Sequence, residues 1–424
     1  MSRGTEYIRN TVSLKGAGIP SFCSSNEYVI KAILEYIRDH DHFALIECTA
    51  NQVNQYGGYT GMRPLDFKEW ILELATQLGV DQERIILGGD HLGPVVFQEQ
   101  NEADAMHESD RLIADFVAAG FEKIHIDTSM RLGSDPIDRP LSNRTIAERG
   151  ARLCKVAEQT YATSFGKPSE LIYVVGSEVP VPGGSQVGEE GLKVTSPEDF
   201  EETYAEYKAV FFQQGLEDAF RRVLAVVVQP GVEFGDNSVH RYCSQSAQPL
   251  SMKLKEYDHL VFEGHSTDYQ TGSSLKKMAE DGFAVLKVGP ELTFSLREAL
   301  FALQHIAGEL NKEVDFIDLL DRVMLSNPQY WGKYYSGTNE AIALKRKYSF
   351  SDRWRYYANH DVLVNEIEKL FSAINESAIP LPLIAQFLPN QYRKLSEGKI
   401  ALRAEDLVKD KVKETVEKYY QAVE

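Results

Sequence analysis

The chain has 424 residues, of which 43% are hydrophobic and 25% are charged, so it is long enough to bury a large core. Its formal net charge of -18 argues against nucleic acid or an anionic membrane surface as a main partner, but it allows a phosphorylated substrate held by a few local cations or amides. Residues 1–15 lack the apolar segment of a signal peptide, no apolar run is long enough for a membrane span and the cysteines are scattered, so we expect a cytoplasmic protein with reduced thiols.

Eight short runs rich in Val and Ile are predicted to be strands covered on both faces. They are residues 19–23, 44–47, 85–88, 123–126, 172–176, 224–228, 260–263 and 285–288. Helical patterns separate them, and the clearest spans residues 66–78, with a capping residue at Asp66 and a stop at Gly79. Eight strand–helix units over roughly 300 residues favour an α/β fold, the (β/α)8 TIM barrel. An open doubly wound sheet is the alternative, but the glycine-rich phosphate loop that usually follows its first strand is missing.

The pattern changes after residue 288, where apolar and aromatic residues recur at helical spacing and no convincing strand follows. We therefore expect two parts. The TIM barrel domain would span residues 1–304, and a helical C-terminal extension over residues 305–424 would pack on the barrel.

Two aromatic patches of the extension, residues 330–335 and 354–357, suit an interface with the barrel or between the subunits of a homo-oligomer. A second interpretation is a cover over the barrel mouth. Such a cover would bring Arg353 or Arg355 to a substrate phosphate.

Asp90 and His91 are the first candidates for chemistry, because they follow the third predicted strand and lie between glycines that let the backbone approach a ligand. Active sites of such barrels lie at the C-terminal strand ends, so His265, after the seventh strand, can meet His91 across the barrel mouth. Imidazoles with a carboxylate suit a divalent metal such as Zn²⁺ or Mn²⁺. The loops after strands five and six are expected to supply the third ligand: Glu178 first, with Gln229 and Glu233 as rivals.

Strand four carries His125 and Asp127, which alternate along the chain and so point to the same face. Asp127, at the strand end, is the better candidate for an acid/base role, and His125, which lies deeper, is expected to make core hydrogen bonds. Glu47 ends strand two and precedes a loop rich in amides, including Asn51 and Gln52, that suits sugar hydroxyls. A polar surface loop stabilised by Asx turns is the alternative for this segment.

The loops after strands seven and eight commonly bind phosphate in barrels. Here Ser266, Thr267 and the backbone amides near Gly289 are the expected phosphate ligands. The chain contains neither the Gly-x-x-x-x-Gly-Lys-Ser/Thr pattern of an ATP loop nor the Gly-x-Gly-x-x-Gly pattern of a dinucleotide site. A kinase or a nicotinamide enzyme is therefore disfavoured.

Several long motifs are specific enough to compare with known families. They occupy residues 47–62, 88–94, 178–184, 229–234, 265–271 and 348–353. Together they closely resemble the GatZ/KbaZ family of tagatose-1,6-bisphosphate aldolase subunits, once described as tagatose-6-phosphate kinases, over essentially the whole chain. The resemblance implies a class II aldolase-like barrel. It also implies that the chain is either a metal-dependent ketose or ketose-phosphate 4-epimerase, or a non-catalytic partner that stabilises a separate class II aldolase chain.

The class II aldolase pattern implies roles for individual residues. Asp90 and His91 match its catalytic Asp and metal-binding His. His265 only approximates its later His, because residues 263–266 read Glu-Gly-His-Ser where the pattern has His-Gly-x-Ser. The third His, expected after strand six, is missing, since residues 229–233 read Gln-Pro-Gly-Val-Glu. The metal ligands are therefore expected to differ from those of a true aldolase.

Aldol chemistry follows from this resemblance. The carbonyl of a 2-ketose acidifies the hydrogen on C3 but not the one on C4, so inversion at C4 is expected to proceed by retro-aldol cleavage between C3 and C4. Asp90 is the expected base, with Asp127 or Asp268 as the second acid/base, and Gln229 and Arg353 are expected to contact the substrate. We expect a metal-dependent ketohexose or ketohexose-phosphate 4-epimerase of the tagatose/fructose type. The alternative is a tagatose-1,6-bisphosphate aldolase subunit, catalytic or stabilising a separate aldolase chain, in galactitol, tagatose or N-acetylgalactosamine catabolism.

Overall fold

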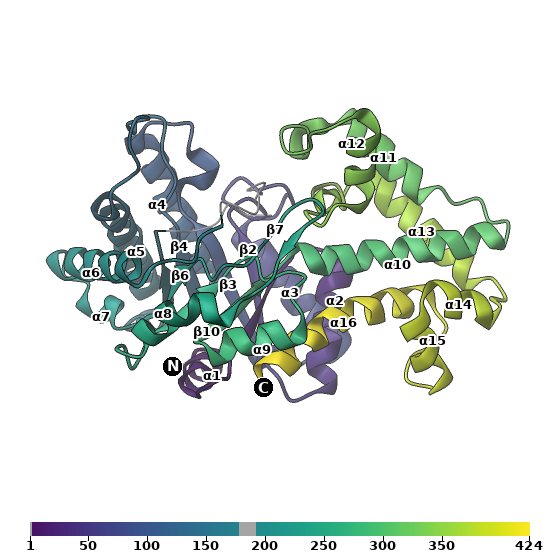
Figure 1. The fold of residues 1–424 in the computed structure, drawn as a ribbon, viewed down its shortest axis with the longest axis horizontal. Helices are drawn as coiled ribbons and strands as arrows, with labels where there is room; N and C mark the ends of the chain where they lie inside the picture. Colours follow the sequence, from purple (N-terminus) through teal and green to yellow (C-terminus); the bar gives the residue numbers. More distant parts are fainter. Residues whose placement is uncertain (1, 178–191) are drawn as a thin grey trace.

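Eight parallel strands close into a barrel in the computed structural model, which describes residues 2–177 and 192–424 (Figure 1). The strand order around the barrel is β1-β10-β9-β6-β5-β4-β3-β2, which confirms the predicted TIM barrel. The strands are β1 (Ile19–Cys23), β2 (Ala44–Thr49), β3 (Ile85–Leu92), β4 (Lys123–Ile126), β5 (Ile172–Val175), β6 (Val223–Val228), β9 (Val261–Gly264) and β10 (Phe283–Val288). Nearly all their residues are buried, as expected of strands enclosed by a ring of helices.

Helices follow the strands and cover the outside of the barrel. They are α2 (Glu27–Asp39), α3 (Pro64–Leu78), α4 (Glu102–Ala119), α5 (Asn143–Phe165), α6 (Pro197–Gln213), α7 (Glu217–Phe220), α8 (Ser244–Leu254), α9 (Gly272–Glu280) and α10 (Pro290–Glu309). Gly79 ends α3 as predicted, at φ 69°, but the helix begins before the predicted start at Asp66. Arg63 is the capping residue, and the Asp66 carboxylate, inside the first turn, accepts its backbone N–H. A small hairpin of β7 (Glu233–Phe234) and β8 (Val239–His240) follows β6.

Strand β3 is longer than predicted and carries the Asp90–His91 pair inside the strand rather than after it. His91 has a φ of 49°, a left-handed conformation that non-glycine residues rarely adopt. Gly93 follows at a point where a Cβ atom would come within 1.9 Å of the Asp127 carbonyl oxygen. The glycine therefore allows β3 and β4 to approach closely at the end that carries the candidate site.

The barrel interior is layered. Its lower part is apolar and is closed by helix α1 (Arg3–Ser13). The packed residues of this layer are Ile8, Ile19, Leu45, Ile86, Ile172, Val174, Leu224, Ala225, Val227, Val261, Ala284 and Val285. Charged and polar side chains replace the apolar ones nearer the C-terminal strand ends, so the barrel is closed by apolar packing at one end and polar at the other.

The C-terminal extension contains the remaining helices: α11 (Phe316–Ser326), α12 (Asn339–Tyr348), α13 (Asp361–Asn375), α14 (Leu381–Phe387), α15 (Pro389–Ser396) and α16 (Ala404–Val423). The predicted division at residue 304 falls inside α10, which runs on alongside α16 (Figure 1). Helix α16 returns to the barrel and packs against α2, α9 and β1. The end of the extension is therefore part of the barrel wall.

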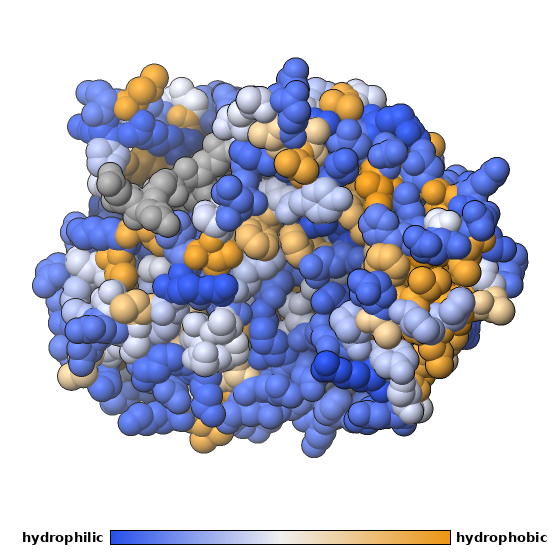
Figure 2. Space-filling view, turned by 45° about the vertical axis from the view of Figure 1, so that its right-hand side comes forward, coloured by the Kyte–Doolittle hydropathy of each residue, from blue (hydrophilic) through white to orange (hydrophobic). Residues whose placement is uncertain are grey.

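The outer helices of the extension present apolar side chains to solvent, and Figure 2 shows such residues gathering at that side of the molecule. Large exposed apolar residues in this part are Leu325, Leu344, Tyr348, Val362, Val364, Leu381 and Leu402. This surface suits the predicted self-association, which stays a prediction. Among the described residues, none of the helices combines the length and apolar character that crossing a bilayer requires.

Candidate active site and metal centre

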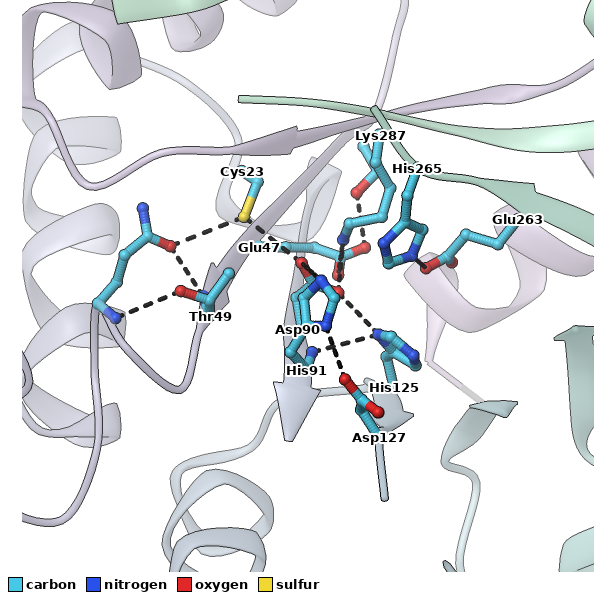
Figure 3. A network of polar contacts seen from close by, with 12 residues as sticks. Cys23, Glu47, Thr49, Asp90, His91, His125, Asp127, Glu263, His265 and Lys287 are labelled. Atoms are coloured by element: carbon cyan, nitrogen blue, oxygen red, sulfur yellow. Dashed lines mark hydrogen bonds and ion pairs between the residues drawn. The ribbon is translucent and has the colours of Figure 1, made fainter. Parts of the chain in front are cut away.

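Four buried side chains meet inside the barrel mouth: Asp90, His91, His125 and His265. They come from β3, from β4 and from the turn after β9, and each offers one ligand atom within 4.8 Å of those of the others (Figure 3). The centres of the His91 and His265 rings lie 5.0 Å apart, as expected for imidazoles that converge across the mouth. The structure adds His125, which the sequence had placed in a core hydrogen-bonding role.

His125 has the contacts of a metal ligand with a carboxylate behind it. Its Nδ1 lies 2.8 Å from Asp90 Oδ1, and its buried Nε2 has no hydrogen-bond partner in the described part of the chain. The backbone N–H of His91 also points to Nδ1, at 3.2 Å, so the tautomer decides which ring nitrogen has a free lone pair. In the tautomer in which Nδ1 donates its hydrogen to the carboxylate, Nε2 is free to bind a metal. A ligating histidine with a carboxylate on its other nitrogen is the usual arrangement at metal sites.

The carboxylate of Asp127 bonds with the imidazole of His91. The carboxylate Oδ2 lies 2.8 Å from His91 Nδ1, and Oδ1 accepts the backbone N–H and the hydroxyl of Ser129. Burial raises the pKa of Asp127, but the hydrogen bonds from His91 and Ser129 and the His91 charge outweigh it and bring the pKa to about 2. Both oxygens of Asp127 are bonded to His91 and Ser129, and Asp127 does not line the cavity over the cluster, so positioning of His91 suits it better than the predicted proton transfer.

His265 is oriented by Glu263, whose Oε1 lies 2.9 Å from its Nε2. Burial lowers the pKa of His265 to about 4, against the effect of that carboxylate. The ring is therefore neutral near neutral pH, the state in which imidazole binds a metal.

The donor set fits a divalent metal ion. Three imidazoles with a carboxylate beside them are the kind of ligands that catalytic zinc and similar ions use. Of the other two predicted ligands, Glu178 lies outside the described residues. The buried Glu233 is not in the cluster, and its Oε1 atom accepts the backbone N–H of Phe234.

An ionic network lies directly beneath the cluster. Lys123 bridges Glu47 and Glu263, each at 2.7 Å, and Lys287 bridges Glu47 and Asp90, at 2.9 and 3.0 Å. All five groups are buried. The network explains why Glu47, predicted to contact the sugar, does not line the cavity: its carboxylate is fully engaged below it.

The positive charges near Asp90 determine its protonation state. Burial raises its pKa, but the charges of His91 and Lys287 and the hydrogen bond with His125 hold the pKa well below its usual range. Lys287 in turn stays protonated, because the nearby carboxylates raise its pKa above the ordinary value in spite of its burial. A protonated Lys287 is not a Schiff-base nucleophile.

A cavity of about 90 Å³ opens over the cluster. Its wall contains Asp90, His91 and His265 together with the predicted substrate ligands Asn51, Gln52 and Ser266 and the predicted acid/base Asp268. Tyr59, Arg355 and Tyr356 also line it, and the Tyr59 and Tyr356 rings pack edge to face with centres 4.9 Å apart. Residues 354–357, the second aromatic patch, thus contribute to the wall over the barrel mouth, in agreement with the second interpretation of this patch. Arg355 rather than Arg353 lines this cavity.

Asp268 occupies the position expected for phosphate. Its Oδ1 accepts the backbone N–H groups of Gly289 and Glu291 at the start of α10, at 3.0 and 2.8 Å. Burial raises the pKa of Asp268 to about 7 although these hydrogen bonds lower it. The prediction that the amides near Gly289 bind phosphate is therefore wrong, because a carboxylate of the chain already fills them.

Three other predicted substrate ligands have structural partners instead. The Thr267 hydroxyl donates to the Lys287 carbonyl. The side-chain amide oxygen of Gln229, Oε1, accepts two backbone N–H groups of its own turn, from Gly231 and Val232. Arg353 donates to the Tyr330 carbonyl, and its guanidinium lies 3.3 Å from the centre of the Tyr334 ring. None of these three side chains lines the cavity over the cluster.

Comparisons with known proteins agree with this architecture. A sequence model of the D-tagatose-1,6-bisphosphate aldolase subunit GatZ/KbaZ-like family matches residues 5–424. Among solved structures, the chain is similar to a probable tagatose 6 phosphate kinase from Sinorhizobium meliloti 1021, at 40% identity and a TM-score of 0.88, over 96% of this chain and 100% of that one. It also matches the YdjI aldolase from Escherichia coli K12 (10% identity, TM-score 0.42, 88% of this chain and 98% of that one). A fructose-bisphosphate aldolase from Campylobacter jejuni matches at 14% identity and a TM-score of 0.44, over 87% of this chain and 93% of that one.

Proposed function

The chain belongs to the D-tagatose-1,6-bisphosphate aldolase subunit GatZ/KbaZ-like family, and we propose that it catalyses metal-dependent aldol chemistry at the C3–C4 bond of a tagatose-type ketohexose or its phosphate. One observation carries the proposal. Asp90, His91, His125 and His265 lie together in the wall of a covered cavity or directly behind it, so a single chain supplies metal ligands and a base.

His91, His125 and His265 would hold a divalent ion, which supplies Lewis-acid polarisation of the C2 carbonyl when bound. Asp90 is an ionised carboxylate in the cavity wall, so it is placed to take the proton of the C4 hydroxyl as the C3–C4 bond breaks. Asp268, with a pKa of about 7 in the same wall, is matched to donating or accepting a proton near neutral pH. Asn51 and Gln52 hold the sugar hydroxyls from the second strand end.

Two outcomes share this step and differ in the fate of the aldehyde fragment. Release of the fragment makes the protein an aldolase or a subunit of one, which is what the family description favours. Rotation and recombination on the opposite face make it a 4-epimerase. The cover formed by Tyr59, Arg355 and Tyr356 favours retention of the fragment, so the 4-epimerase is the second candidate. A kinase is not proposed, because the ATP-loop pattern is missing from the sequence.

One assay tests the proposal. The purified chain is incubated with Mn²⁺, Zn²⁺ or EDTA and with fructose, tagatose, their 6-phosphates or tagatose 1,6-bisphosphate, and the products are separated. Triose products indicate an aldolase, interconversion of the fructose and tagatose series indicates a 4-epimerase, and turnover only after addition of a class II aldolase chain indicates a stabilising subunit. Asp90→Asn is the matched inactive control. Turnover that persists in this variant or in EDTA contradicts the proposed chemistry.

A further inference from the structure

The cavity over the cluster is small for a whole six-carbon substrate. Its volume is about 90 Å³, whereas small-molecule sites usually measure roughly 300–1,000 Å³. A groove of about 670 Å³ lies beside it and shares Asn51, Tyr59 and Tyr356 with its wall. Asp127, which bonds with His91, lines the groove as well. The groove therefore begins next to the cluster and offers the room that the cavity lacks.

A buried arginine lines this groove. Arg353, on the short helix η5 (Arg353–Tyr356), is only 5% exposed. Its guanidinium carbon lies 3.3 Å from the centre of the Tyr334 ring, and its Nη1 donates to the Tyr330 carbonyl at 3.0 Å. Both tyrosines line the groove too, so they fix the guanidinium at its wall. The other edge of the guanidinium, with Nε and Nη2, makes no hydrogen bond within the described part of the chain.

Arg353 also makes no ion pair with any described residue. The neighbouring carboxylate of Asp352 is engaged by Arg297, whose Nε lies 2.9 Å from Asp352 Oδ1. Burial lowers the pKa of Arg353, Tyr356 raises it, and the positive charge of Arg355 lowers it again. An anion in the groove would offset both the burial of this guanidinium and the repulsion from its neighbour.

The other charged groups of the groove favour a single negative charge in the ligand. Among the described residues they are Lys333, which is exposed, and Asp127, which is already bonded to His91. Because solvent screens the exposed lysine, Arg353 supplies the one buried positive charge that lacks a partner. A carboxylate matches this charge and presents two oxygens to one edge of the guanidinium, whereas a phosphate monoester carries about −1.5 to −2 charges. Neutral side chains that suit hydroxyls complete the polar part of the described wall: Asn51, Asn54, Gln98, Ser129, Ser177 and Gln329.

We infer that the groove binds the far end of the substrate and that Arg353 pairs there with a carboxylate, so that the protein takes a ketose acid, a ketohexose whose C6 is a carboxylate. The inference rests on the proposed function, which places the C2 carbonyl at the cluster and the C3–C4 bond beside Asp90. The carboxylate lies beyond the bond that breaks. Arg353 is therefore a specificity-determining residue, which acts on binding and orientation of the substrate.

Three open-chain compounds of six carbons test the site without turnover, since none has an aldehyde or ketone group. They are gluconate, glucitol and glucitol 1-phosphate, which carry a carboxylate, a hydroxymethyl group and a phosphate ester at the same end. Isothermal titration calorimetry on the full-length protein loaded with Zn²⁺ measures their binding. The variants are R353Q, R353K and, as the control on the exposed rim of the same groove, K333Q. Thermal unfolding checks that each variant is folded.

The wild type is expected to bind gluconate about tenfold or more tightly than glucitol, and more tightly than glucitol 1-phosphate. R353Q is expected to weaken the binding of gluconate about tenfold to a hundredfold and to leave glucitol within about twofold. R353K keeps the charge without the planar fork, so its affinity for gluconate is expected to lie between those of R353Q and the wild type. K333Q is expected to change that affinity by less than about threefold.

Equal affinity of the wild type for gluconate and glucitol overturns the inference, and this comparison needs no variant to fold. An equal loss for gluconate and glucitol in R353Q overturns it as well. Tighter binding of glucitol 1-phosphate than of gluconate would contradict the carboxylate and make the groove a phosphate site. Gluconate binding that EDTA abolishes and R353Q leaves unchanged would place the carboxylate on the metal instead.

Failure of the proposed function gives a different result. A protein that turns over no ketose, neutral or acidic, sinks the proposed function, while the binding of gluconate still decides whether Arg353 holds a carboxylate. Turnover of neutral ketoses that is unchanged in R353Q, with fructuronate and tagaturonate unreactive, sinks this inference alone.

Discussion

Lys287 and Asp90 form an ion pair inside the barrel, with Lys287 Nζ 3.0 Å from Asp90 Oδ1. The same Nζ lies 2.9 Å from Glu47 Oε2, so one buried cation joins two buried carboxylates from β2 and β3. Because Asp90 also bonds with His125, the ionic layer beneath the site and the metal cluster form one continuous network. Loss of any member therefore removes part of the charge compensation of its buried neighbours.

Lys287→Met is expected to lower the free energy of unfolding by about 3–5 kcal/mol, the usual cost of breaking a buried ion pair by removing one partner. Urea denaturation of the metal-free protein measures the change. Lys277→Met is the control, because Lys277 makes only surface ion pairs, with Glu280 and Asp281, which solvent screens. Equal stability of the two variants would mean that water reaches the Lys287 network.

His125→Gln is expected to weaken the binding of Zn²⁺ or Mn²⁺ by about a hundredfold or more, since even residues behind the ligands change metal affinity by about 10–100-fold. Competition with a chromogenic chelator measures the affinity, and His107→Gln, at an exposed position on α4, is the control. A variant with unchanged metal affinity and reduced stability would return His125 to the core hydrogen-bonding role that its depth in the strand suggested.

The strands were predictable because each is a local run of apolar residues whose burial does not depend on distant partners. The ion pairs of Lys123, Glu263 and Lys287 were not predictable, since charges within buried strands are stabilised only by one another across the barrel. Lys123 meets Glu47, for example, 76 positions away in the sequence. Alternation placed His125 and Asp127 on one face of their strand without deciding between the barrel axis and the helices, and the height of His125 relative to Asp90 depends on strand stagger, which no residue pattern states.

The loops were less predictable than the strands for a similar reason. Thr267, Gln229 and Glu47 have the chemistry of substrate ligands, and composition does not reveal that internal partners already bind them. Asp268 shows the same limit. Its residue type made it a candidate for catalysis, which stays a prediction, but only the structure shows that it accepts hydrogen bonds from the amides expected to bind phosphate.

Asp268→Asn is expected to flatten the decrease in stability between about pH 4 and pH 7. A carboxyl with a folded-state pKa raised to about 7 binds its proton more tightly in the folded chain than in the unfolded one, so stability is full below the unfolded pKa and is lost as the pH rises toward 7. The loss is up to roughly 4 kcal/mol for a shift of about three pH units.

The measurement is the free energy of unfolding of wild type and variant at several pH values between 4 and 8. Asparagine keeps an oxygen that can accept the N–H groups of Gly289 and Glu291, so the turn is preserved. Asp115→Asn is a useful comparison, because burial raises the pKa of that carboxyl as well but it is far less enclosed. Parallel pH profiles for the wild type and Asp268→Asn would show that the carboxyl titrates in its ordinary range.

A chain that ends at residue 304 is expected not to fold, because it lacks α16. The apolar residues that α16 buries are Leu407, Val408, Val412, Val416, Tyr419 and Tyr420. At about 1.5–3 kcal/mol for each buried side chain, their loss is on the order of 10 kcal/mol, comparable with the whole stability of a typical domain. Far-UV circular dichroism and size-exclusion chromatography of the shortened chain test this expectation.

Tyr419→Phe examines the same contact without removing the helix. The Tyr419 hydroxyl donates to the Thr267 carbonyl at 2.8 Å and lies 2.9 Å from the Thr267 hydroxyl, so its loss removes buried hydrogen bonds and leaves the carbonyl only the longer bond from the Gln270 N–H. We expect a cost of about 1–3 kcal/mol and one unfolding transition shared by near-UV and far-UV signals, because barrel and extension unfold together. Tyr348→Phe, at a half-exposed position, is expected to change stability by less than about 0.5 kcal/mol. A cooperative transition in the chain shortened at residue 304, or two separate transitions in Tyr419→Phe, would show instead that the barrel folds without its C-terminal helix.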